Sequence, residues 1–171
     1  PDLFNATIGR EGVCIYDNFG SMDPETILGK IRYMATVGGC NYIVLDHISI
    51  MLSGLSGDNG TKELDRVMTQ LVSLAKELNI CIITVSHLTK NSGGTPFEEG
   101  AQISLQNARG SQGIAQLSYI VIAVERNQQA EKEADRDLIT LRVLKNRPFR
   151  RTGVACKLLY DHQTGRLHDL P

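Results

Sequence analysis

The chain has 171 residues, of which 42% are hydrophobic and 22% are charged, and its formal net charge is −1. These values predict a single globular domain over 1–171 and exclude a global attraction to nucleic acid or to a membrane. Any such partner must bind a local patch of Lys and Arg. No apolar run approaches the roughly 20 residues that span a bilayer, and residues 1–12 lack the pattern of a signal peptide, so we expect a cytoplasmic protein. The four cysteines form no C-x-x-C and are expected to be reduced core thiols.

Apolar runs alternate with segments of helical periodicity in the first half of the chain. Helices are expected over 23–39 and 61–78, with Asp23 and Thr61 as N-caps and Pro24 at the first helical position. Strands are expected at three continuously apolar runs, residues 13–17, 41–48 and 80–88. Continuous apolarity with helices between strands is typical of parallel strands that are covered on both faces.

The second half begins with a polar stretch over 89–102 and a helix that is expected to end near Ser118. The short turn "DHQTG" predicts an antiparallel hairpin near the C-terminal end. The fold class expected is therefore α/β, with a mainly parallel twisted sheet flanked by helices and an antiparallel edge at its C-terminal side. Four further strands are expected at 119–125, 138–145, 154–160 and 166–170.

Two neighbouring strands of this predicted sheet end in polar residues. Asp46 closes the strand over 41–48, and Ser86 and His87 close the strand over 80–88. In an α/β sheet the carboxyl ends of the strands carry the chemistry, so a carboxylate there can hold a hydrated Mg²⁺ beside nucleotide phosphates. The alternatives are a turn-forming aspartate and an ordinary turn histidine.

Five motifs in register carry a resemblance to a known family. They are "GCNYIVLDHISIMLSG", "SHLTKN" followed by "EEG", "ARGSQGIAQLS", "AVERNQQ" and "LRVLKNRPFRRTG". In this order they resemble the C-terminal half of the helicase domain of phage primase-helicases, which are hexameric replicative helicases with a RecA-like core. The resemblance runs from about Tyr16 to Leu167. It implies a DNA helicase that hydrolyses ATP or dTTP with Mg²⁺ and moves 5′ to 3′ along single-stranded DNA.

The resemblance implies roles for three residues near the nucleotide phosphates. Asp46 matches the Walker B acid that holds Mg²⁺ through water, and His87 matches the sensor of the γ-phosphate. Gln116, in "AQLS", matches a glutamine that couples the nucleotide state to the DNA-binding loops. A neutral imidazole and a carboxylate suit these roles chemically.

Two residue pairs match the base site and the intersubunit finger of the family. Arg126 and Tyr160 match the pair that sandwiches the nucleotide base, a role that suits a guanidinium plane and an aromatic ring. Lys145 and Arg147 match the finger pair that reaches the γ-phosphate bound to the neighbouring subunit. The alternatives are a surface ion pair for Arg126, core packing for Tyr160, and solvated charge for the finger pair.

The loops after Asp46 and His87 are those through which the family contacts single-stranded DNA. The first loop offers backbone amides and hydroxyls, with Ser53, Gly54 and Gly57 as candidates, but no cation. In the second loop Lys90 and Asn91 are the candidates. Phage relatives place several lysines there, whereas this chain has only Lys90, one position away from the matching site, so we expect a weaker grip on DNA.

The sequence contains no G-x-x-x-x-G-K-[ST] motif. We therefore expect 1–171 to be a partial RecA-like domain without the Walker A strand and helix, inactive by itself. The parent is expected to form a hexameric or heptameric ring, to work with a primase domain and a DNA polymerase, to bind no membrane, and to act in the cytoplasm of a bacterial host. The alternatives are an inactive RecA-like binding or regulatory module and a RecA-like recombinase. A dinucleotide-binding oxidoreductase is excluded because G-x-G-x-x-G is absent.

Overall fold

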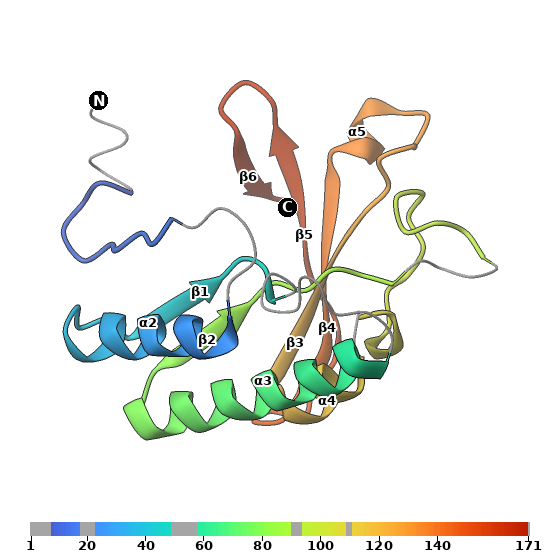
Figure 1. Cartoon of the computed structure of the whole chain (residues 1–171). Coiled ribbons are helices and arrows are strands. Elements are labelled where there is room, and N and C mark those ends of the chain that lie inside the picture. Colours follow the sequence, from blue (N-terminus) through green and yellow to red (C-terminus); the bar gives the residue numbers. More distant parts are fainter. Residues whose placement is uncertain (1–7, 18–22, 49–57, 90–93, 109–110, 171) are drawn as a thin grey trace. The chain divides into compact units, whose positions relative to one another are not determined.

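The computed structural model describes residues 8–17, 23–48, 58–89, 94–108 and 111–170. The chain divides into two compact units, Pro1–Ser86 and His87–Pro171 (Figure 1). The first unit contains helices and a parallel strand pair, and the second contains an antiparallel sheet with short helices. None of the described helices is long and apolar enough to cross a membrane.

The first unit is built from two helices and two strands, α2 (Pro24–Thr36), β1 (Tyr42–Leu45), α3 (Asp58–Leu78) and β2 (Cys81–Thr84). Strands β1 and β2 pair in parallel with Tyr42 opposite Cys81. Helix α3 packs against both α2 and β2. The core of this unit is apolar, and more than half of its residues lie in α3. The buried residues are Ile27, Ile31, Ile43 and Ile48, together with Leu64, Val67, Met68, Leu71 and Leu74 of α3.

The predicted start and stop of helix α2 are confirmed. The carboxylate of Asp23 accepts a hydrogen bond from the backbone N–H of Thr26 at 3.2 Å, and Pro24 occupies the first helical position. The helix ends at Thr36, just before the glycine pair, and a Cβ atom at Gly38 would lie 2.7 Å from the carbonyl oxygen of Met34, so glycine is the residue that fits there. Gly39 has a φ of +66°, in the left-handed region that glycine tolerates.

Two expectations for the first unit are wrong. Residues 13–17 form neither helix nor strand and are exposed, because none of the described strands supplies the hydrogen bonds that a strand there requires. Helix α3 begins at Asp58, so Thr61 lies inside the helix and is not its N-cap. The first turn of a helix tolerates residues of low helix propensity, since its N–H groups have no intrahelical partners.

The second unit is organised around a four-stranded antiparallel sheet of order β3-β4-β5-β6. Its buried apolar residues include Ile103, Ile114 and Ala123. The predicted hairpin "DHQTG" is confirmed between the last two strands, where Gly165 N–H donates to the carbonyl oxygen of Asp161 at 2.8 Å. The elements are η2 (Leu105–Asn107), α4 (Ser111–Leu117), β3 (Ile120–Arg126), α5 (Glu133–Arg136), β4 (Leu138–Asn146), β5 (Gly153–Asp161) and β6 (Arg166–Asp169).

The expectation of a mainly parallel sheet is corrected by this topology. Among the described residues only β1 and β2 pair in parallel, and β3 to β6 are antiparallel throughout. The connection from Arg126 to Leu138 is shorter than the dozen or so residues that a parallel crossover needs. It contains α5, a four-residue helix that is too short to produce a helical period in the sequence. The α/β class itself is confirmed.

The expectation of buried thiols is also corrected. All four cysteines are free, but Cys14 and Cys81 are exposed, and Cys40 and Cys156 are half-buried. In β1 the side chains alternate, with Ile43 buried and Tyr42 and Val44 exposed at 74% and 66%. Cys81, opposite Tyr42 in the register, lies at an equally exposed position of the pair.

Candidate functional site

Asp46 follows directly on the carboxyl end of β1, at the edge where β2 also ends. The backbone N–H of Val85 donates to the Leu45 carbonyl at 3.0 Å, and the N–H of Ile48 donates to the Val85 carbonyl at 2.9 Å. Ile48 is almost fully buried, whereas Asp46 is exposed, so the backbone here is fixed while the carboxylate faces solvent. The expected placement of Asp46 at a strand tip is confirmed.

Asp46 offers one exposed carboxylate, a ligand type that can hold a hydrated magnesium ion. Among the residues that the structure describes, no three His, Cys, Asp or Glu side chains are arranged to hold a metal. Mg²⁺ keeps several water ligands and binds through one or two carboxylates together with phosphate oxygens. A single exposed carboxylate at a strand tip is compatible with that mode.

His87 lies three residues beyond the end of β2, and it opens the second unit. The chain after it is anchored, because Thr89 N–H donates to the Asn107 carbonyl at 2.8 Å and Leu88 forms a β-bridge with Ala108. Asp46 belongs to the first unit, so the proximity of Asp46 and His87 stays a prediction. The DNA-loop candidates lie outside the described residues: Ser53, Gly54, Gly57, Lys90 and Asn91.

The predicted base-binding pair, Arg126 and Tyr160, comes together in the second unit. Arg126 is the last residue of β3 and Tyr160 lies near the end of β5, and the guanidinium carbon lies 6.0 Å from the centroid of the ring. Stacked bases lie about 3.4 Å apart, so a base between two planar groups needs about 6.8 Å. At 6.0 Å the guanidinium is within range of a direct cation–π contact with the ring, so the two groups would have to separate by about 1 Å to admit a base.

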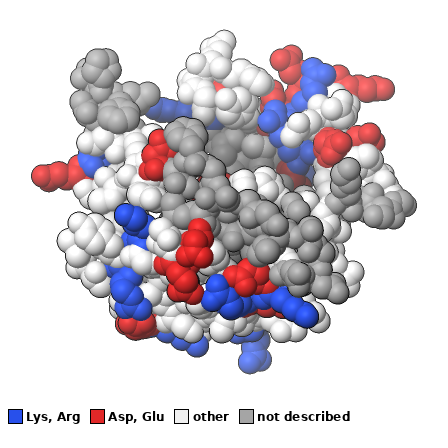
Figure 2. Space-filling model, viewed as in Figure 1, with Lys and Arg blue, Asp and Glu red and all other residues white. Residues whose placement is uncertain are grey.

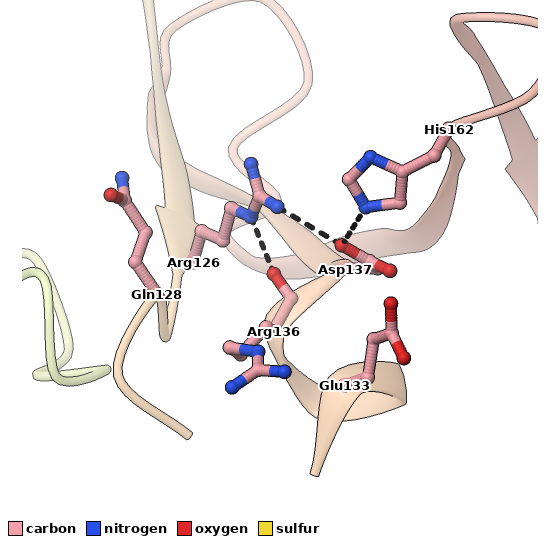
Figure 3. A pocket seen from close by; sticks show the side chains of 6 residues that line it. All are labelled: Arg126, Gln128, Glu133, Arg136, Asp137 and His162. Atoms are coloured by element: carbon pink, nitrogen blue, oxygen red, sulfur yellow. Dashed lines mark hydrogen bonds and ion pairs between the residues drawn. The ribbon is translucent and has the colours of Figure 1, made fainter. Parts of the chain in front are cut away.

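Asp137, which no sequence motif marked, contacts Arg126 and His162 (Figure 3). Its Oδ1 accepts a hydrogen bond from Nη2 of Arg126 at 3.1 Å and lies 2.8 Å from Nε2 of His162. The ring of His162 meets the ring of Tyr160 edge-on, with the centroids 4.9 Å apart. Neither residue stands in a motif, since Asp137 precedes a strand and His162 lies in a turn, and both positions are ordinary for these residue types.

A cavity of about 330 Å³ adjoins this pair, a volume at the lower end of the range for small-molecule sites. Its walls carry both signs of charge and an amide, which is a polar rather than an apolar lining (Figure 3). Such groups offer hydrogen bonds to a polar ligand edge. The lining residues are Arg126, Gln128, Glu133, Arg136, Asp137 and His162.

The predicted finger residues Lys145 and Arg147 come together at the C-terminal end of α4, where Gln116 also lies. The Lys145 ammonium donates to the carbonyl oxygens of Ala115 and Gln116, and the Arg147 guanidinium donates to that of Gln116. The last carbonyls of a helix have no intrahelical partner and carry partial negative charge, so they attract cations. Burial lowers the pKa of Lys145, and the charge of Arg147 lowers it further.

A partly buried ion pair also lies in the second unit. Oε1 of Glu125 accepts from Nε of Arg142 at 2.8 Å and from the backbone N–H of Ile103 at 2.9 Å. The contact raises the pKa of Arg142 above its ordinary value. The two residues lie on neighbouring strands, so the sequence alone gave no sign of the pair.

Charges of both signs are mixed on the visible face of the molecule, where Lys and Arg lie beside Asp and Glu (Figure 2). In the first unit this mixing includes ion pairs between α2 and α3, with Arg32 bound to Glu77 and Arg66 bound to Glu25. A nucleic-acid partner would therefore meet no broad basic surface on the described part of this face.

Comparison with known proteins places these features in a family. Residues 5–169 match the DnaB-like helicase C terminal domain. The chain is 37% identical to the DNA helicase/primase of Enterobacteria phage T3 over 97% of its length, and 27% identical to the replicative DNA helicase DnaC of Bacillus subtilis (strain 168) over 82%. It spans 29% and 31% of these two relatives.

A solved structure shares the fold at low sequence identity. It is described as the structure of a DnaB-like replicative helicase and its interactions with primase. The match covers 93% of this chain and 37% of the chain in that structure, with a TM-score of 0.71 and 17% sequence identity. Together with the family match and the phage relative, this shows that the chain belongs to the family of DnaB-like helicase C-terminal domains.

Proposed function

We propose that this chain forms part of a ring-shaped replicative helicase that couples NTP hydrolysis to movement along single-stranded DNA. The observation that carries the proposal is the approach of Arg126 to Tyr160, with 6.0 Å between the guanidinium carbon and the ring centroid, and the polar cavity that Arg126 lines. A guanidinium plane and an aromatic ring bind a base through stacking and cation–π attraction. This supports a nucleotide site in the second unit.

In this mechanism Asp46 would hold Mg²⁺ through water, and the ion would neutralise charge on the β- and γ-phosphates. His87 would sense the γ-phosphate, and Gln116 would pass the nucleotide state to the DNA-binding loops. The nucleotide bound would be ATP or dTTP. The phosphates themselves would be held by Walker A groups, which the 171 residues do not contain.

Lys145 and Arg147 would act across the subunit boundary, where their charge stabilises the transition state of hydrolysis. Their convergence on the end of α4 supports a shared role, because both side chains contact the carbonyl of Gln116. Such a finger contributes roughly 10³ to 10⁵ in rate. The same proposal includes a hexameric or heptameric ring that works with a primase and a DNA polymerase in the cytoplasm of a bacterial host. Single-stranded DNA would contact Ser53, Gly54, Gly57, Lys90 and Asn91.

A mixed-ring experiment tests this proposal. In a helicase that joins this sequence to a Walker A segment, Arg147→Ala should bind nucleotide nearly normally yet hydrolyse it roughly 10³-fold more slowly. Rings mixed from Arg147→Ala and Asp46→Ala subunits should regain part of the DNA-stimulated hydrolysis, because some interfaces then join an intact Asp46 site to an intact Arg147. The controls are demonstrated subunit exchange and wild-type subunits that stay active in the same mixtures. If the mixed rings are inactive when both controls hold, action of Arg147 in trans is contradicted.

A further inference from the structure

Asp137 is the only polar or charged residue classed as buried among those that the structure describes, with 8% of its surface exposed. It connects α5 to β4, and no motif of the family resemblance contains it. Burying a carboxylate is unfavourable unless it is paired and hydrogen-bonded. The contacts that Asp137 makes therefore account for its place in the fold.

These contacts lead to both members of the base-binding pair. Oδ1 of Asp137 accepts from Nη2 of Arg126 at 3.1 Å and lies 2.8 Å from Nε2 of His162. The carbonyl oxygen of Asp137 accepts from the backbone N–H of Tyr160 at 3.0 Å. Asp137 thus holds the guanidinium through its side chain and the aromatic residue through its backbone.

The orientation of each planar group is fixed by a second contact. Nε of Arg126 donates to the carbonyl oxygen of Arg136, so two donors of the guanidinium are held and its plane is set. His162 contacts the carboxylate of Asp137 (Figure 3). Its ring also meets the ring of Tyr160 at an interplanar angle of 90°. Preorganised groups bind a ligand with a smaller loss of entropy.

We propose that Asp137 is a positioning residue for the nucleobase of the NTP, because it fixes the guanidinium of Arg126 and, through His162, the ring of Tyr160. This inference rests on the base-binding role proposed above for Arg126 and Tyr160. It adds Asp137 and His162 to that site. Neither residue needs to touch the phosphates, so their effect should depend on the presence of a base.

The test compares a substrate that has a base with one that lacks it. In a helicase that joins this sequence to a Walker A segment, KM and kcat are measured for dTTP or ATP and for ribose 5-triphosphate. Asp137→Ala should raise KM for the nucleotide roughly tenfold, the effect of about one lost charge-assisted hydrogen bond, with a much smaller change in kcat. KM for ribose 5-triphosphate should stay the same, because that substrate has no base to position.

Matched variants separate positioning from folding. Asp135→Ala, which removes the same charge from exposed helix α5 two residues earlier, should leave both KM values unchanged. Asp137→Asn keeps an oxygen that accepts from Arg126 and should recover part of the affinity. Thermal melting of each variant shows whether it is folded, and Asp137→Asn supplies the comparison if the alanine variant is not.

Two results distinguish failure of the inference from failure of the underlying site. An equal rise of KM for both substrates after Asp137→Ala would overturn the inference, because a structural defect acts without regard to the base. A rise with Arg126→Met but none with Asp137→Ala would overturn it as well and leave the base site intact. No rise with Arg126→Met would overturn the proposed base site itself.

Discussion

The guanidinium of Arg147 donates a hydrogen bond to the backbone carbonyl oxygen of Gln116, the penultimate residue of α4. Lys145 donates to the same oxygen at 3.2 Å. The two cations therefore complement the partial negative charge at the end of this helix. A finger that reaches a neighbouring subunit would have to exchange these bonds for bonds to phosphate.

Replacement of Lys145 by methionine should lower the free energy of unfolding by about 0.5 to 1 kcal/mol, because the helix end loses a cation that satisfies two carbonyls. Urea denaturation of the chain measures the change. Arg151→Met, at an exposed position of the same unit, is the control and should have a smaller effect. Equal losses in both variants would show that the docking on α4 contributes nothing specific.

Gln116→Ala should leave that docking in place, because Lys145 and Arg147 contact the backbone carbonyl and not the amide side chain. The free energy of unfolding should change by less than about 0.5 kcal/mol, as is usual for an exposed position. In the ring-forming helicase the same variant should lose stimulation of hydrolysis by single-stranded DNA. Full stimulation in the alanine variant would remove Gln116 from the coupling role.

The ring of Tyr160 should matter to nucleotide binding more than its hydroxyl. Tyr160→Phe keeps the stacking surface and should bind a fluorescent NTP analogue with nearly the wild-type Kd, whereas Tyr160→Ala should weaken binding roughly tenfold, since base stacking contributes about 1 to 3 kcal/mol. Titrations monitored by fluorescence give both values. If the two variants behaved alike, stacking on this ring would not be the source of affinity.

Stability of the first unit should fall in acid. Hydrogen bonding to Arg32 holds the pKa of Glu77 below its ordinary value of 4.5, and hydrogen bonding to Gln70 and Arg66 does the same for Glu25. A carboxyl group whose pKa is lowered by folding stabilises the folded state at pH values above its ordinary pKa. This contribution is lost as the pH falls through the pKa of the folded state. Glu77→Gln should therefore be less stable than wild type at pH 7 and nearly equal to it at pH 2. If the difference in stability between wild type and Glu77→Gln persisted at pH 2, it would come from packing and not from the charge of Glu77.

The 171-residue chain alone should show no measurable NTP turnover. Mg²⁺ coordination by Asp46 supports hydrolysis only when backbone amides and a lysine also hold the phosphates. The 171 residues contain no G-x-x-x-x-G-K-[ST] motif to supply these groups. A phosphate-release assay on the purified chain decides this. Turnover that disappears in the Asp46→Ala variant would contradict the expectation and would point to phosphate binding by other residues.

The extent of the antiparallel sheet, which includes β3 and β4, was the part of the fold that sequence reasoning missed. Apolar runs at β3, β4 and β5 marked strands correctly, but an apolar run is compatible with parallel and antiparallel neighbours alike. The direction follows from the connections, and the segment between β3 and β4, whose helix α5 has four residues, joins these strands in an antiparallel arrangement. Likewise Thr61 resembled a helix cap, yet α3 begins earlier, because helix ends are weakly encoded locally.

The sequence by itself determined the local features and the family. Asp23 and Pro24 set the start of α2, the glycine pair set its end, and the motifs around Asp46, Arg126 and Lys145 marked the candidate members of the proposed site. Only the tertiary structure decided how those members are held. Asp137 meets Arg126 and His162, which lie 11 and 25 residues away along the chain, and Arg147 meets the carbonyl of Gln116, 31 residues away. Such contacts arise from strand register and helix placement, and no local pattern of residues encodes them.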